Sequence, residues 1–227
     1  MGHSVVHCGT GNIGATALKA IINSPELKLV GHYVSTPEKV GRDSGELVGV
    51  DAVGVTTTND WTELVDLGAD CLTYFGNSIG READAISDLV PFLQRGTNVV
   101  TFSGFAIAHP ATTPPEFREP IESACRAGNS SCFFTGIDPG WATTDLAIAA
   151  LAVANRIDCI RVMELGWWGD YIAEFVCREY FGFGTVAAGT ASVVHFEYQA
   201  LSGGKPFAVV EHVDCVARDV GKQWKQP

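Results

Sequence analysis

A glycine-rich segment near the start of the chain has the residue types and spacing that bind phosphate. The pattern G-x-G-x-x-G is formed by Gly9, Thr10, Gly11, Asn12, Ile13 and Gly14. It follows an apolar run and opens a helical pattern, which is the context that this motif requires. Gly9 permits a tight turn, Gly11 admits a pyrophosphate, and Gly14 lets helix and strand pack closely. We therefore predict that free amides at the start of this helix bind the pyrophosphate of a nicotinamide dinucleotide.

The residues after the second predicted strand indicate which dinucleotide is bound. An Asp or Glu at this position usually binds the ribose 2′-hydroxyl of NAD(H). This chain has Ser35 and Thr36 there, with Lys39 and Arg42 nearby. Small hydroxyls and a cation suit a 2′-phosphate, so NADP(H) is the favoured cofactor, and one of the two cations is expected to be a solvated loop charge. NAD(H) is the alternative, with Glu38 as its ribose ligand.

Two later loops are expected to line the same cofactor, because ligands of such sheets bind beyond the carboxyl ends of the strands. The first loop is Phe75, Gly76, Asn77 and Ser78, and the second is Ser103, Gly104 and Phe105. Small residues in both loops would let the backbone pass close to ribose and nicotinamide. Each loop is also an ordinary turn at the end of a strand, and this interpretation stays open.

Carboxylates are the candidate acid/base groups. Glu116 lies in the first turn of a predicted helix, where the helix dipole favours a carboxylate without any catalytic role. The functional interpretation is that Glu116 faces the nicotinamide cleft and shuttles protons. Glu164, on a later predicted strand, is the alternative.

Aromatic residues gather in the sequence after the sixth predicted strand. Trp141 and Trp168 lead the candidates for the wall of an apolar substrate pocket, with Tyr171 beside them. Asp138 is expected to cap the following helix, with a place in the substrate pocket as the alternative. His109 is interpreted as a loop histidine or as a substrate contact.

Composition and charge limit the classes of function. The chain has 227 residues, 46% of them hydrophobic and 18% charged, which is enough for one dinucleotide domain and a small second one. A formal net charge of −11 argues against binding to nucleic acid or to an anionic membrane, since both need clustered positive charge. No apolar run has membrane-spanning length and no signal segment opens the sequence, so a cytoplasmic protein is expected.

Several chemistries lack their motifs. The seven cysteines are scattered, with neither C-x-x-C nor zinc spacing, which predicts free thiols, no metal site and a reducing compartment. The sequence contains no Tyr-x-x-x-Lys pair, no P-loop and no G-x-S-x-G elbow. A short-chain dehydrogenase, a P-loop nucleotidase and an α/β-hydrolase are therefore not favoured.

The elements that must position these residues alternate between strand and helix. Apolar runs predict strands over 4–8, 28–34, 51–55, 71–75, 98–102 and 131–135. Helical periodicity predicts helices over 12–23, 61–67, 79–93 and about 115–127, and the polar stretch 35–49 is expected to be loop. This alternation favours a Rossmann-type, doubly wound parallel sheet over residues 1–138.

The pattern changes after Pro139. A helix is expected over 141–154, followed by strands over 157–168, 193–200 and 207–216. The last two strands are joined at Ser202-Gly203-Gly204-Lys205, a plausible hairpin turn. Residues 139–227 are therefore expected to form a small α+β domain with an open sheet, for substrate and dimerisation. One face of that sheet must be covered by substrate, by the first domain or by a second subunit.

The chain resembles the dihydrodipicolinate reductase-like family, and within it the group of native amine dehydrogenases and 2,4-diaminopentanoate dehydrogenases. The resemblance is carried by VVHCGTGNIG, LVGHYVSTPEKVGRD, NVVTFSGFA, PPEFREPIESACRAG, TGIDPGW, GDYIAEFVCREYFGFG and FEYQALSGGKPFAVVEHV. It implies NAD(P)-dependent interconversion of a ketone plus ammonia with a primary amine. It also implies a homodimer whose open sheets pack together.

The chain departs from that family in two respects. Relatives carry a long, largely helical insertion between the positions of Gly184 and Thr185, and further chain after the end, so a compact member or a fragment is expected. The diaminopentanoate dehydrogenases have a carboxylate pair after the fifth strand, where this chain has Ser103 and Gly104. The assignment of Glu116 therefore rests on its proximity and not on the resemblance.

Three functional hypotheses follow. The favoured one is an amine dehydrogenase for small apolar ketones, aldehydes and amines. The alternatives are a ketone or imine reductase that uses no ammonia, and a non-catalytic NADP-binding regulatory protein.

Overall fold

The computed structural model describes residues 2–104, 107–108, 110–111, 113–156, 160–162, 195–202 and 205–212. At 138–139 and 143–144, and from 160 onward, the description covers the backbone. The chain divides into two compact units, Met1–Ala147 and Ile148–Pro227. The boundary expected between residues 138 and 139 stays a prediction.

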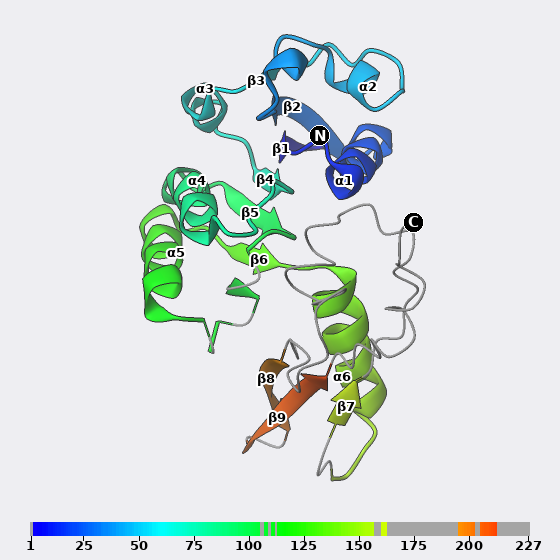
Figure 1. The fold of residues 1–227 in the computed structure, drawn as a ribbon, viewed down its shortest axis with the longest axis vertical. Coiled ribbons are helices and arrows are strands. Elements are labelled where there is room, and N and C mark those ends of the chain that lie inside the picture. Colours follow the sequence, from blue (N-terminus) through cyan, green and yellow to red (C-terminus); the bar gives the residue numbers. More distant parts are fainter. Residues whose placement is uncertain are drawn as a thin grey trace, which may run out of the picture. The chain divides into compact units, whose positions relative to one another are not determined.

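The first unit is built on a six-stranded sheet (Figure 1). Its strands are β1 His3–Cys8, β2 Leu27–Tyr33, β3 Thr57–Thr58, β4 Cys71–Tyr74, β5 Asn98–Thr101 and β6 Cys132–Phe134. All neighbours pair in parallel, in the order β3-β2-β1-β4-β5-β6. The predicted Rossmann-type sheet is thereby confirmed. The strand order reverses between β1 and β4, the switch point beyond which ligands of such sheets bind.

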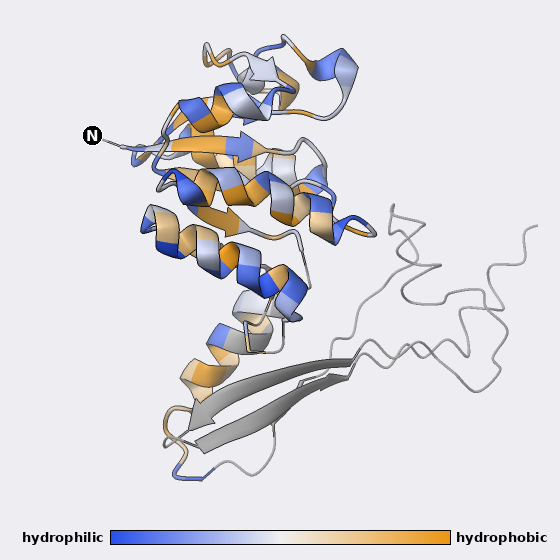
Figure 2. Cartoon of the chain, turned by 90° about the vertical axis from the view of Figure 1, so that its left-hand side faces the viewer, coloured by the Kyte–Doolittle hydropathy of each residue, from blue (hydrophilic) through white to orange (hydrophobic). Residues whose placement is uncertain are grey.

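Helices cover both faces of this sheet. Their bounds are α1 Asn12–Asn23, α2 Ser44–Leu47, α3 Trp61–Asp66, α4 Glu82–Gln94 and α5 Pro115–Gly128. Strand side chains alternate between the faces. Val5 packs with Leu18 of α1, while Val6 packs with residues of α3, α4 and α5. Figure 2 shows largely hydrophobic strands next to helices in which hydrophobic and hydrophilic residues alternate.

The predicted strand over 51–55 is wrong, and the third strand is β3, at Thr57–Thr58. The Asp43 carboxylate accepts hydrogen bonds from the backbone amides of Val53 at 3.1 Å and Gly54 at 2.8 Å. Because these amides donate to a side chain, they cannot donate to a neighbouring strand of the sheet. The apolar pattern of this stretch is therefore overridden by these two hydrogen bonds to the Asp43 carboxylate.

The stretch 35–49 is not loop throughout. It contains a 3₁₀ turn at Pro37–Lys39 and the four-residue helix α2. Asp43 is the N-cap of α2 and accepts from the amides of Gly45 and Glu46. The polar composition suggested loop because a capping Asp and a Gly are typical of turns as well as of short helices.

The predicted helix over 79–93 is observed as α4, which begins three residues later. Gly80 has φ +71°, a left-handed conformation that a right-handed helix does not contain. Before it, Asn77 Oδ1 accepts a hydrogen bond from the amide of Ile79 at 3.1 Å. The loop that follows β4 is therefore longer than predicted.

After β6 the chain forms a π-helix, Ile137–Asp145, that continues into α6, Leu146–Leu151. This helical segment starts before the predicted residue 141 and ends before residue 154. Its N-cap is Gly136. Asp138 consequently lies within the first turn and is not the cap that the sequence predicted; its side chain lies outside the described residues.

The described part of the second unit contains three strands, β7 Ile160–Val162, β8 His195–Ser202 and β9 Lys205–His212. Their order is β7-β9-β8, with β7 parallel and β8 antiparallel to β9. Ser202 pairs with Lys205, as the predicted hairpin requires. The second domain as a whole stays a prediction. None of the helices in the described ranges has the length and apolar composition needed to cross a membrane.

Candidate functional site

The glycine motif connects the end of β1 with the start of α1, at the switch point of the sheet. Gly9 has φ +113°, and a Cβ atom there would lie 2.6 Å from the carbonyl oxygen of Phe75. A Cβ atom on Gly14 would lie 2.7 Å from the carbonyl oxygen of Gly9. On Gly11, by contrast, a Cβ atom would meet nothing within 4 Å among the described atoms. Gly9 and Gly14 are thus required by the backbone, and Gly11 borders open space.

The N-terminus of α1 suits an anion. Gly11 is its N-cap, and no side chain of the described residues makes a capping hydrogen bond there. The first amides of a helix have no partner within the helix, and the dipole of a 12-residue helix favours negative charge at this end. A pyrophosphate over Gly11 would therefore meet free amides in the space that the missing Cβ leaves open.

The segment after β2 brings a cation to the glycine motif. Lys39 Nζ donates a hydrogen bond to Thr10 Oγ1 at 2.8 Å. The Thr57 hydroxyl donates to the Lys39 carbonyl oxygen at 2.6 Å and so fixes this turn to β3. Arg42 is exposed, and Thr57 contacts its backbone. Of the two predicted cations, Lys39 is the one that the fold places against the motif.

The other candidates after β2 line the same edge of the sheet. Ser35, Thr36 and Glu38 follow the end of β2 and are all exposed. Their side chains are therefore accessible to a ribose or to its phosphate. The geometry does not choose between the Ser35 and Thr36 hydroxyls and the Glu38 carboxylate.

The two predicted cofactor loops are joined by hydrogen bonds. The Gly104 amide donates to Ser78 Oγ at 2.7 Å, and the Ser103 hydroxyl donates to the Gly76 carbonyl oxygen. The Thr101 hydroxyl lies within hydrogen-bond distance of two carbonyl oxygens, that of Tyr74 at 3.0 Å and that of Ser103 at 2.8 Å. Ser78, Thr101 and Ser103 are all buried. The loops that follow β4 and β5 are therefore connected to each other through buried hydroxyl groups.

Sequence reasoning placed Gly76, Asn77, Ser103 and Gly104 in these loops but did not assign the connecting role of Thr101. A Thr at the last position of an apolar strand was the available signal. Asn77 is exposed and its carbonyl oxygen accepts from Arg81 Nη1 at 2.9 Å. Phe75 is half-buried, and its ring stacks on that of Phe102 with centroids 6.1 Å apart.

Two histidines beneath the glycine motif were not predicted to belong to the site. His7 of β1 and His32 of β2 are both 0% exposed, and their ring centroids lie 5.3 Å apart. His7 Nε2 lies 2.9 Å from the Gly9 carbonyl oxygen, and its Nδ1 lies 2.8 Å from Thr73 Oγ1. Burial lowers the pKa of His7 to about 4. Burial, and then the neighbouring His7, lower the pKa of His32 to about 3.

Of the catalytic and substrate-pocket candidates, the structure places two by their side chains. Glu116 is exposed in the first turn of α5, and this turn lies at the carboxyl end of β5 because α5 connects β5 with β6. Trp141 lies in the π-helix and is 57% exposed. The remaining calls lie outside the described residues: Phe105, His109, Glu164, Trp168, Tyr171 and the Asp138 side chain.

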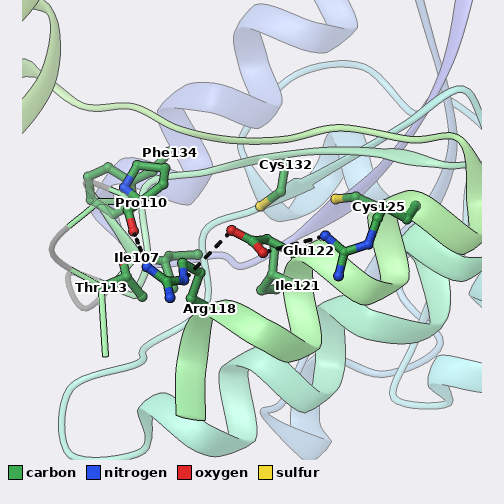
Figure 3. A pocket seen from close by; sticks show the side chains of 10 residues that line it. Ile107, Pro110, Thr113, Arg118, Ile121, Glu122, Cys125, Cys132 and Phe134 are labelled. Atoms are coloured by element: carbon green, nitrogen blue, oxygen red, sulfur yellow. Dashed lines mark hydrogen bonds and ion pairs between the residues drawn. The ribbon is translucent and has the colours of Figure 1, made fainter. Parts of the chain in front are cut away.

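A cavity of about 310 Å³ lies along α5 and β6. Its wall includes Ile107, Ile121 and Phe134 (Figure 3). Arg118 and Glu122 also line it and form an ion pair, with Arg118 Nε 3.7 Å from Glu122 Oε1. The cavity borders β6, which β4 and β5 separate from β1. The cavity is therefore distinct from the glycine motif, and Glu116 is not among its lining residues.

The strand order, the glycine turn at the switch point and the uncapped helix define a Rossmann-type domain. Residues 3–84 match the family model described as dihydrodipicolinate reductase, N-terminus. An amine dehydrogenase from Streptomyces virginiae is 27% identical over 281 aligned positions, which cover 99% of this chain and 78% of that protein. A 4-hydroxy-tetrahydrodipicolinate reductase from Trichormus variabilis is 39% identical over 56 residues, or 24% of this chain and 20% of that one.

The fold has a solved counterpart. The structure of an amine dehydrogenase from Mycobacterium smegmatis superposes with a TM-score of 0.63 at 23% identity. The match covers 71% of this chain and 47% of that one, so this chain spans about half the length of that structure. Together with the family match, these similarities confirm the resemblance predicted from the sequence.

The alignment with the Streptomyces virginiae protein also bears on length. It extends over 281 positions, whereas this chain has 227 residues. That relative therefore contains residues without a counterpart here, as expected if an insertion is missing. Residues that build its pocket need not have equivalents in this chain.

Proposed function

We propose that this protein is an NAD(P)H-dependent amine dehydrogenase, which aminates small apolar ketones or aldehydes reductively with ammonia and catalyses the reverse oxidative deamination. The proposal is supported by the likeness to the Streptomyces virginiae enzyme over 99% of the chain. The structural observation that carries it is the uncapped start of α1 at Gly11, with Lys39 Nζ 2.8 Å from Thr10 Oγ1 beside it.

The proposed cofactor is NADP(H). A dinucleotide with its pyrophosphate over Gly11 would direct its adenine ribose toward the end of β2. Lys39 is held there, and its ammonium can exchange the neutral Thr10 hydroxyl for a phosphate oxygen. A charge-assisted hydrogen bond of this kind is stronger than the neutral one that it replaces. NAD(H) is the alternative, with the exposed Glu38 carboxylate binding the ribose.

In the amination direction, ketone, ammonium ion, NADPH and a proton give the protonated amine, NADP⁺ and water. Ammonia adds to the carbonyl carbon, the carbonyl oxygen leaves as water, and an imine remains. The dihydronicotinamide of a bound cofactor would supply the hydride that reduces the imine carbon. The connected loops that contain Ser78, Ser103 and Gly104 would position the substrate beside the nicotinamide and limit access of water.

Glu116 is the proposed acid/base group. It would accept a proton from the ammonium ion, so that the resulting ammonia can attack the carbonyl carbon, and it would return a proton to the departing oxygen. Its position in the first turn of α5, at the carboxyl end of β5, is compatible with this role, and its exposure leaves it free to contact substrate. Glu164 remains the alternative acid/base group.

The test is a cofactor-dependent assay with a panel of small ketones and aldehydes, each run with NADPH and NADH and with and without ammonium. Consumption of reduced cofactor that requires ammonium supports the proposal, and the amine product should be detected by mass spectrometry. Equal consumption without ammonium would point to a ketone or imine reductase. Cofactor binding without turnover on the whole panel would point to a regulatory protein.

A further inference from the structure

The hydrogen bonds of His7 fix its tautomer. A carbonyl oxygen can only accept, so His7 Nε2 must carry the proton that it donates to Gly9. In the neutral imidazole, Nδ1 is then unprotonated and accepts from the Thr73 hydroxyl at 2.8 Å. The alternative acceptor of that hydroxyl, the Val6 carbonyl oxygen, is more distant at 3.3 Å. A single neutral imidazole thus connects β4, through Thr73, with the first glycine of the phosphate-binding turn.

The tautomer of His32 follows in the same way. The Ser44 hydroxyl donates its one proton to the Val55 carbonyl oxygen at 2.7 Å. In this arrangement His32 Nδ1, which lies 3.0 Å from Ser44 Oγ, donates to it. This bond joins β2 to α2, and Ser44 joins α2 to the residues that precede β3.

The remaining nitrogen of His32 is anomalous. His32 Nε2 is buried and finds no hydrogen-bond partner within the described part of the chain. An unpaired buried acceptor opposes folding, and a phenylalanine of similar shape would not carry this cost. Because this buried, unpaired nitrogen lowers the stability of the fold, its presence calls for a functional explanation.

The surroundings keep the pair neutral. His32 is adjoined by His7 from β1, by the Gly9 carbonyl oxygen from the glycine motif, by Ser44 from α2 and by the charged Lys39 from the 3₁₀ turn. Burial, His7 and Lys39 lower the pKa of His32, and the Gly9 carbonyl raises it by less. Both imidazoles are therefore uncharged wherever the protein is folded near neutral pH.

Each histidine holds a different part of the cofactor site. His7 holds the carbonyl group of Gly9 and with it the turn that receives the pyrophosphate. His32 holds Ser44, and so the segment between β2 and β3 that carries Lys39. We propose that His7 and His32 are positioning residues of the dinucleotide site, His7 for the pyrophosphate turn and His32 for the Lys39 segment. This inference rests on the proposed function, since it presupposes that a dinucleotide binds here.

The two assignments predict different cofactor effects. NAD⁺ and NADP⁺ share the pyrophosphate, so a defect at His7 should weaken both equally. The 2′-phosphate distinguishes them, so a defect at His32 should weaken NADP⁺ more than NAD⁺. A purely structural role for either histidine would give no such contrast.

The experiment measures dissociation constants for NADP⁺ and NAD⁺ by calorimetry, together with the thermal midpoint of the free protein. His7→Phe removes the donor to Gly9, and His7→Gln keeps an N–H at a similar reach. Val5→Ala is the matched control, since Val5 is 2% exposed on the same face of β1 and packs in a hydrophobic cluster with Leu18. His7→Phe should weaken both cofactors about tenfold, the value of one hydrogen bond, while His7→Gln and Val5→Ala stay within about threefold.

The His32 arm uses the same measurements. His32→Asn keeps an N–H near the position of Nδ1, and His32→Phe removes it. His32→Phe should lower the preference for NADP⁺ over NAD⁺ about tenfold, and His32→Asn should preserve it. If His32→Phe does not fold, His32→Asn and Ser44→Ala replace it. The assignment is then supported if His32→Asn preserves the preference for NADP⁺ over NAD⁺ and Ser44→Ala loses it.

The possible outcomes distinguish a failure of the histidine roles from a failure of the proposed function. If the unaltered protein binds neither cofactor, the proposed function fails and this inference fails with it. If that protein binds and the Phe variants bind equally well, the positioning roles are overturned and the proposed function stands. Equal losses in His7→Phe and Val5→Ala would also overturn the role of His7.

Discussion

The Lys39 ammonium group donates a hydrogen bond to the Thr10 hydroxyl over 2.8 Å, although the two residues are 29 positions apart. The contact joins the connection after β2 to the second residue of the glycine motif. A hydroxyl is a weak partner for a cation compared with a phosphate oxygen. The Lys39–Thr10 contact therefore holds a positive charge beside the glycine motif, where a 2′-phosphate would distinguish NADP(H) from NAD(H).

The first prediction concerns cofactor preference. Lys39→Gln should raise the dissociation constant for NADP⁺ about 10- to 100-fold, since a hydrogen bond to a charged group contributes about 1.5–3 kcal/mol. The constant for NAD⁺ should change little. Arg42→Gln is the control, because Arg42 is an exposed cation in the same connection. Calorimetry with both cofactors checks this, and a parallel loss of NAD⁺ affinity in Lys39→Gln would contradict it.

The second prediction separates binding from folding within the glycine motif. Gly11→Ala places its Cβ in open space, so the thermal midpoint should be unchanged, but the methyl group would occupy the path of the pyrophosphate. NADP⁺ affinity should fall at least tenfold, at a cost of about 1.4 kcal/mol or more. Gly14→Ala forces a Cβ to within 2.7 Å of the Gly9 carbonyl oxygen and should destabilise the fold by roughly 1–3 kcal/mol. Wild-type affinity in Gly11→Ala would place the cofactor elsewhere.

The third prediction concerns the acid/base group. Glu116→Gln should lower kcat about 100-fold or more, the usual contribution of a positioned acid or base, and should leave the dissociation constant for NADP⁺ unchanged. Glu119→Gln, an exposed carboxylate one turn further along α5, is the matched control and should turn over normally. Steady-state kinetics and calorimetry check both variants. Near-full turnover in Glu116→Gln would move the role to Glu164.

The fourth prediction concerns stability at acid pH. Burial lowers the pKa of His7 to about 4 in the folded state, whereas the unfolded chain has the ordinary value near 6.5. Well above pH 6.5 His7 is neutral in both states, and its titration does not affect stability. As the pH falls from 6.5 toward 4, the unfolded state takes up the proton first, so the free energy of unfolding decreases by about 3 kcal/mol.

His32, with its pKa lowered to about 3, acts in the same direction. The double variant His7→Gln, His32→Asn should lose most of this dependence between pH 6.5 and 4. The pKa of Asp70 is lowered by hydrogen bonds from Ser4, so that carboxylate affects stability only at lower pH. Urea unfolding across the pH range provides the measurement. An unchanged slope in the double variant would show that neither histidine is buried in neutral form.

Much of the first unit could be predicted because its signals are local. β1 is an apolar run, α1 has an apolar face, and the glycines between them meet requirements of the backbone itself. Those features lie within about 25 consecutive residues, and the predicted helix over 12–23 coincides with α1. The stretch 51–55 failed because the Asp43 carboxylate binds amides 10 and 11 positions further on, and no local pattern records such a contact.

The sequence alone determined the class of fold, the phosphate-binding turn and two candidate cations, since each depends on residue type and short spacing. The tertiary structure decided which cation reaches the motif, how Ser78 and Ser103 join two loops, and that His7 and His32 lie together beneath Gly9. Those relationships arise when parallel strands bring distant residues into register, such as His7 opposite His32. Register depends on how the whole sheet packs, and it is therefore not contained in any single segment of the chain.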